Sequence, residues 1–256
     1  MRTANAGLRY VLDRPASQES DGDPSLGGKL LWAAELDAES RALVVAGHIA
    51  GAATLTATAN VDAQKQAIRD GVVDFLVTSL DEALRILKNE IRKRQSVAVC
   101  VGAVPKLIES EMMERGVRPD LSREGLTSVA EGEKALRGPA NHPELDPIDA
   151  KTLIVWRVDA APAQWLPKLD ALALDCLDVE DWVARRWLRL GGRSMGRLGQ
   201  GAHLLISNRE FAARMIERTR EHVLRGEIKV RGQIQVSFEG GNEEYDFQPP
   251  GTNQAD

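Results

Sequence analysis

The chain has 256 residues, 43% of them hydrophobic, which at ~150 residues per domain predicts one large or two small domains and excludes wholesale disorder. Its 33 basic and 38 acidic residues leave a net charge of −5, and this acidic balance argues against a general nucleic-acid-binding protein. No apolar run approaches the ~20 residues that span a bilayer, and the first residues contain no apolar signal-peptide block. The two cysteines, Cys100 and Cys176, lie in separate apolar runs, so we expect buried thiols in a reducing compartment. The expectation is a cytoplasmic protein that binds neither membranes nor nucleic acid.

The first half of the chain alternates apolar runs with helical segments. Residues 1–28 are rich in Ser, Asp, Gly and Pro and are predicted to form a flexible arm. The predicted strands are residues 29–36, 53–59, 72–77, 96–101 and 117–121. The predicted helices begin at the N-cap residues Asp37 and Asp62, at the capping box Ser79–Glu82 and at Pro105. Continuous apolar strands between helices predict an α/β fold, a doubly wound Rossmann-like parallel sheet with helices on both faces.

The second half is predicted to continue the same domain. Residues 123–150 are polar, contain three prolines and are interpreted as a long connection. We expect a strand over 152–158, a helical region, a strand over 202–207, a helix over 210–224 and a strand or strand pair over 227–238. This predicts one domain over 29–238, in which 151–238 pack on the earlier part, and a disordered tail over 239–256. Four tryptophans in the helical region favour core or interface packing, with Trp187 beside two arginines as a candidate partner surface.

The first strand-to-helix turn contains no phosphate-binding motif. A dinucleotide-binding turn needs glycines, because the backbone must approach the pyrophosphate and point amides at it. Here residues 34–40 contain no glycine and three carboxylates, those of Glu35, Asp37 and Glu39. The turn is therefore interpreted as a plain capped helix start.

A glycine-rich stretch at residues 191–201 is the main candidate binding site. It has five glycines in eleven residues, together with Arg193 and Arg197, and such a composition suits an anion. No Lys-Ser or Lys-Thr pair follows, so it is no Walker loop. Two interpretations stay open, a surface loop or a site for a small anionic ligand. The candidate ligand-binding residues are Gly192, Arg193, Gly196, Arg197, Gly199 and His203.

The remaining polar residues show no catalytic or metal-binding pattern. The four histidines lack H-x-x-x-H or H-x-E spacing, so no metal site is expected. His48 lies on an apolar helix and is interpreted as a packing residue. No G-x-S-x-G motif or Ser-His-Asp arrangement is visible, and no catalytic residue is assigned.

Several short motifs between residues 29 and 225 resemble those of one enzyme family, urocanase (urocanate hydratase). The motifs are Ile49-Ala50-Gly51-Ala52, Leu80-Asp81-Glu82-Ala83-Leu84, Gly116-Val117-Arg118-Pro119-Asp120, and the segment from Asp181-Trp182-Val183 to Gly191, Gly192 and Gly199. The resemblance implies a Rossmann-type domain, a homodimer, and a hydratase of histidine breakdown that uses tightly held NAD⁺ as an electrophile.

The chain departs from that family at the positions that carry its chemistry. The family's Gly-Leu-Gly-Gly-Met-Gly-Gly-Ala-Gln turn corresponds here to Glu35–Leu43, and its Thr-Asp-Gln-Thr-Ser-Ala-His-Asp-Pro stretch becomes Ser122–Ser128. Val155 stands in place of a family cysteine, and arginine-rich sequence near Arg186 and Arg189 replaces paired histidines. The chain is also much shorter than a full urocanase.

These departures lead to one main hypothesis and one alternative. The main hypothesis is a urocanase-like Rossmann-fold protein that lacks hydratase activity and cofactor and acts as a binding or interaction module. The alternative is an anionic-metabolite or nucleotide-binding enzyme related to urocanase, an NAD-dependent hydro-lyase, that uses the glycine-rich stretch. Under either hypothesis, the expected partners of the protein are a small anionic ligand and a second copy of the chain.

Overall fold

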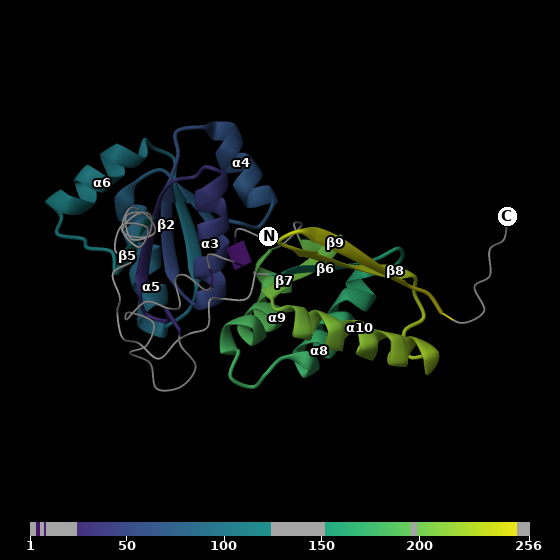
Figure 1. Cartoon of the computed structure of the whole chain (residues 1–256). Helices are drawn as coiled ribbons and strands as arrows, with labels where there is room; N and C mark the ends of the chain where they lie inside the picture. The colour runs from purple at the N-terminus through teal and green to yellow at the C-terminus, as the bar shows by residue number, and fades with distance from the viewer. Residues whose placement is uncertain (1–3, 6–7, 9–24, 124–151, 196–198, 250–256) are drawn as a thin grey trace. The chain divides into compact units, whose positions relative to one another are not determined.

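The computed structural model describes residues 4–5, 8, 25–123, 152–195 and 199–249 (Figure 1). Most of the predicted arm and nearly all of the predicted connection over 123–150 lie outside these residues. The chain divides into two compact units, largely residues 3–142 and largely residues 143–256. The prediction that 151–238 pack on the earlier part of the chain stays a prediction.

The N-terminal unit is built on a five-stranded parallel sheet with the order β3-β4-β2-β1-β5. Its strands are β1 (Leu30–Glu35), β2 (Ala53–Ala57), β3 (Phe75–Val77), β4 (Val97–Val101) and β5 (Leu121–Ser122). The strands β2 and β4 are buried along their whole length, which explains why the predicted runs are continuously apolar. The doubly wound Rossmann-like fold is confirmed for this unit.

Helices cover both faces of the parallel sheet. They are α3 (Ala38–Ala50), α4 (Val61–Arg69), α5 (Leu80–Lys93) and α6 (Pro105–Glu114). Apolar side chains of α5 and α6 share one buried cluster with Trp32, Leu55 and Val99. The α3 helix packs on the opposite face, where a Cβ on Gly47 would lie 2.7 Å from Leu31 Cδ2, so this close approach requires glycine.

Helix caps explain where the predicted boundaries are right and where they are wrong. Asp37 caps α3 as predicted, and Ser79 caps α5 by accepting the Glu82 amide. The cap of α4 is Asn60 rather than Asp62, because its side chain accepts the first free amides of the helix. Two predicted strands begin late because their first residues close the preceding helix, as when the Val72 amide bonds the Ala67 carbonyl.

The C-terminal unit has its own antiparallel sheet with the order β7-β6-β8-β9. Its strands are β6 (Thr152–Val158), β7 (Ala202–Ser207), β8 (Gly232–Phe238) and β9 (Gly241–Phe247). The parallel pattern therefore ends with the N-terminal unit. The prediction of a disordered tail from residue 239 is wrong over β9, which pairs with β8 and places Phe247 opposite Gly232. Gly232 makes room for that ring, because a Cβ there would lie 2.4 Å from Phe247 Cζ.

Three helices lie along one side of this antiparallel sheet (Figure 1). They are α8 (Pro162–Cys176), α9 (Trp182–Ser194) and α10 (Arg209–Leu224). The tryptophans contribute to their core: Trp156 and Trp187 are buried, and Trp187 Nε1 donates to the Leu204 carbonyl at 2.6 Å. The interpretation of Trp187 as an exposed partner surface is therefore wrong. Among the described helices, none is both long enough and apolar enough to cross a bilayer.

Candidate functional site

The turn after β1 holds a charged cluster at the N-terminus of α3. Asp37 Oδ1 accepts the Ser40 amide at 2.8 Å, as an N-cap does. Arg123, which follows β5, donates from Nη1 to Asp37 Oδ2 at 2.7 Å and to Ser40 Oγ at 2.9 Å. Its Nη2 donates to Glu39 Oε2 at 2.7 Å. One guanidinium thus bridges two of the three carboxylates of the turn, and we call Asp37, Glu39, Ser40 and Arg123 the α3 cluster.

The backbone beside the α3 cluster is held by the chain's own side chains. Ala34 adopts a left-handed conformation with φ of 56°, and its carbonyl accepts Thr56 Oγ1 at 2.8 Å. The buried Ser40 hydroxyl donates to the Ala33 carbonyl. The end of β1 and the first turn of α3 are thereby tied together by side chains, where a glycine-rich turn would leave room for a ligand.

The contacts of the α3 cluster also set its charge. Partial burial raises the pKa of the Asp37 carboxyl, but the Ser40 amide, the Arg123 guanidinium and the Glu39 amide outweigh it, so that pKa lies below its ordinary value. Burial lowers the pKa of Arg123, and its bonds to the two carboxylates raise it by more. Asp37 and Arg123 are therefore both charged at neutral pH.

This arrangement does not fit the pyrophosphate of NAD. Two carboxylates against one guanidinium leave an excess of negative charge, which would repel a phosphate group. The Ser40 amide, which would face a phosphate in a dinucleotide site, already donates to Asp37. Three N–H groups of Arg123 already donate within the cluster, to Asp37, Ser40 and Glu39. The expectation of a capped helix start is confirmed by the Asp37 cap, and the absence of a phosphate site stays a prediction.

The structure places part of the predicted anion-binding stretch in a helix. The α9 helix continues through Arg193 to Ser194, so the first residues of the glycine-rich stretch are helical and do not form a loop. Gly196 and Arg197 lie outside the described residues. Gly192 lies on α9 beside the His203 ring, and a Cβ there would be 3.4 Å from its Cε1. Of the six candidate residues, the structure thus brings together Gly192, Gly199 and His203.

His203 is buried and has protein partners on both ring nitrogens. Its Nδ1 lies 2.7 and 2.8 Å from the two Asp170 oxygens, and its Nε2 lies 2.9 Å from the Gly199 carbonyl. Asp170 also accepts Trp156 Nε1 at 3.0 Å. This buried network joins β6, α8 and β7, and neither nitrogen of His203 faces open space. Whether the glycine-rich stretch binds an anion stays a prediction.

Ser96, His48 and Asp74 meet at the amino-terminal end of the parallel strands, a grouping that the sequence did not reveal. His48 Nε2 lies 3.4 Å from Ser96 Oγ, but its Nδ1 lies 3.9 Å from Asp74 Oδ2, too far for a hydrogen bond. Asp74 Oδ2 instead accepts the Ala98 amide at 2.7 Å. Asp74 thus connects the start of β3 to β4. Ser96, His48 and Asp74 are the residue types of a catalytic triad, but the hydrogen bond from the histidine to the aspartate is missing.

In the described part of the chain, the two cysteines are not activated as nucleophiles, and the residue types that bind metals form no cluster. Desolvation by burial raises the pKa of Cys100 to about 11, and burial also raises that of Cys176. Both thiols are therefore protonated at neutral pH. Among the described residues, no three His, Cys, Asp or Glu side chains gather as a metal site requires.

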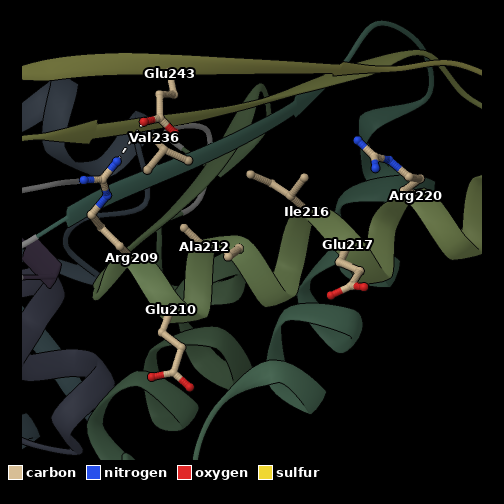
Figure 2. Close-up of a pocket in the computed structure, with 9 residues that line it drawn as sticks. Arg209, Glu210, Ala212, Ile216, Glu217, Arg220, Val236 and Glu243 are labelled. Atoms are coloured by element: carbon tan, nitrogen blue, oxygen red, sulfur yellow. Dashed lines mark hydrogen bonds and ion pairs between the residues drawn. The ribbon is translucent and has the colours of Figure 1, made fainter.

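A groove of about 610 Å³ lies between α10 and the β8–β9 hairpin in the C-terminal unit (Figure 2). Ala212 and Ile216 of α10 and Val236 of β8 form its apolar floor. Arg209 and Arg220 lie at its two ends, and Arg209 Nη2 donates to Glu243 Oε1 at 2.8 Å. The sequence showed no motif for this groove, because its residues come from a helix and two strands that meet only in the fold.

The described geometry can be set beside a comparison with protein families. Residues 12–130 match the model of the urocanase Rossmann-like domain. The resemblance predicted from the motifs is thereby confirmed for this stretch, which contains the whole α3 cluster and ends before β6. This stretch of the chain is thus similar to the urocanase Rossmann-like domain.

Proposed function

We propose, on the premise that residues 12–130 form a urocanase Rossmann-like domain, that this protein holds no NAD at the first β–α turn, lacks urocanate hydratase activity and acts as a binding module. The α3 cluster is the observation that carries this proposal. Asp37, Glu39 and Arg123 take up the place where the resemblance implies a glycine-rich phosphate turn.

Two departures from the urocanase pattern meet at this cluster. Asp37 and Glu39 stand in the segment that replaces the family's glycine turn, and Arg123 stands in the segment that replaces its stretch after the fifth strand. The departures lie 86 residues apart in sequence and form a direct ion pair in the fold. The N-terminus of α3 favours the two carboxylates, and Arg123 neutralises part of their charge through its two ion pairs. The changes therefore form a consistent unit that supports the Rossmann scaffold without a dinucleotide.

The first test is whether the purified protein carries or binds NAD. We expect mass spectrometry of the supernatant after denaturation to find no NAD, and added NAD to leave the melting temperature unchanged, since a ligand of the native state raises it by mass action. Mixing with urocanate should produce no decay of its absorbance. Stoichiometric NAD, or turnover of urocanate, would overturn the proposal.

A matched pair of variants tests the physical reason. If Asp37 and Glu39 exclude phosphate, then Asp37→Asn/Glu39→Gln frees Arg123, and the variant should gain measurable affinity for ADP. Asp62→Asn removes an exposed carboxylate from the first turn of α4 and should gain none. Equal behaviour of the two variants would contradict the role assigned to the α3 cluster.

The proposed partners need separate tests. A second copy of the chain remains our proposed partner, and sedimentation at several concentrations tests it. A single monomeric species at every concentration would contradict it. The small anionic ligand is tested by melting with inorganic phosphate, in the wild type and in Arg193→Ala/Arg197→Ala. A shift confined to the wild type supports the site, whereas no shift or an equal shift in both refutes it.

A further inference from the structure

The groove on α10 has an apolar floor and an arginine at each end, of which only Arg209 forms an ion pair among the described residues. Ala212 and Val236 lie beneath the groove, each 3% exposed, and the half-buried Ile216 supplies most of the apolar surface that a ligand would contact. Glu210 and Glu217 also border the groove, but their carboxylates point away from the β8–β9 strands (Figure 2). The groove volume lies within the ~300–1,000 Å³ of small-molecule sites.

The arginine at one end of the groove is already neutralised. Arg209 forms an ion pair with Glu243 at 2.8 Å, and its guanidinium lies 4.0 Å from the centre of the Phe238 ring. Glu243 pairs with the charge of Arg209, and the Phe238 ring covers one face of its guanidinium. A ligand would gain little from Arg209 without breaking these contacts.

The arginine at the other end has no such partner. Arg220 Nε donates to the Tyr245 hydroxyl at 3.0 Å, and its guanidinium lies 5.4 Å from the centre of the Tyr245 ring. The Tyr245 hydroxyl bond and, more weakly, the Glu217 carboxylate raise the pKa of Arg220, so the guanidinium is oriented and stays charged. In the described part of the chain, Arg220 forms no ion pair within 4.0 Å, and its terminal nitrogens remain available for a bidentate contact with a carboxylate.

We propose that this groove binds an apolar monocarboxylate, a short- to medium-chain fatty acid or a molecule of that shape. The carboxylate is held by Arg220, and the apolar body lies over Ile216, Ala212 and Val236 toward Arg209. The two arginines are eleven residues apart on α10, which at 1.5 Å per residue corresponds to roughly 16 Å. An elongated ligand fits this length better than a compact one. The proposal does not depend on the absence of NAD at the α3 cluster.

The test is calorimetric titration of the full chain with octanoate, below the concentration at which it forms micelles. We expect saturable binding by the wild type and a loss of about tenfold or more in Arg220→Gln, because a charge-assisted contact is removed. Arg218→Gln is the matched control, since Arg218 lies two residues away on the same helix and pairs with Glu221. It should bind as the wild type does. Octanol, which keeps the tail and lacks the charge, should bind at least tenfold more weakly than octanoate.

A second variant tests the floor. Ile216→Trp fills the groove with an apolar side chain and should abolish octanoate binding, while circular dichroism shows that the fold is kept. The proposal is overturned if the wild type does not bind octanoate, if Arg218→Gln weakens binding as much as Arg220→Gln, or if octanol binds as well as octanoate. Unchanged binding by a folded Ile216→Trp variant would place the ligand elsewhere and overturn it as well.

Discussion

Replacing Arg123 with alanine tests the α3 cluster most directly. The change removes two ion pairs, whose carboxylates in Asp37 and Glu39 are 44% and 60% exposed, and one hydrogen bond to Ser40 Oγ. Such exposed pairs contribute about 0.2–1 kcal/mol each, and a hydrogen bond contributes about 1 kcal/mol. We therefore expect Arg123→Ala to lower the free energy of unfolding by about 2 kcal/mol, measured by urea denaturation.

A double-mutant cycle with Asp37→Asn separates the ion pair from general damage. If Arg123 acts through Asp37, the two substitutions together should cost less than the sum of their separate effects. The cost of Arg123→Ala should also shrink in acid. The native pKa of Asp37 lies below its unfolded value, so its contribution is present above the unfolded pKa, near 4, and is lost as the pH falls through the native one. A cost below about 0.5 kcal/mol, or strictly additive effects, would refute the reasoning.

Three further predictions concern the interior of the two units. Gly232→Ala should cost about 3 kcal/mol in thermal unfolding, because the new Cβ would lie 2.4 Å from Phe247 Cζ, while Gly201→Ala, with open space around it, should cost almost nothing. Asp170→Asn should cost about 2 kcal/mol by the same measurement, because His203 and Trp156 lose a charged acceptor, and an unchanged midpoint would contradict the network. Cys100 should react with a disulfide reagent only after denaturant is added, because its buried thiol has a pKa of about 11, and rapid labelling of the native protein would show that it is exposed.

The sequence predicted most of the N-terminal unit because its signals are local. The continuous apolar run of β4 and the capping residue Ser79 each act within a few residues of their own position, and the structure places both as expected. The errors there concern strand starts, where the first residues of a predicted strand close the preceding helix. An apolar run can begin a strand or close the preceding helix, and only the hydrogen bonds in the folded structure distinguish these two possibilities.

The C-terminal unit was predicted less well because its strands depend on distant partners. The β9 strand carries four exposed residues in a row, and its pairing with β8 gives it order that its composition does not indicate. The wrong prediction of an exposed Trp187 has a different cause, because the spacing of the apolar residues around it already indicated burial. Val183, Ala184, Trp187 and Leu188 repeat at helical spacing and form the buried stripe of α9, with the arginines outside it.

The candidate site shows the same division between local and distant information. The lack of glycines at residues 34–40 could be read from the sequence, and it correctly indicated a capped helix start. Arg123 could not be assigned, because its partners lie more than 80 residues away and an arginine after a short strand has no local meaning. Its position changes the interpretation of the turn. Without Arg123, the two carboxylates would only cap and border the helix start, whereas with it they form an ion-paired cluster that joins the end of β5 to the first turn of α3.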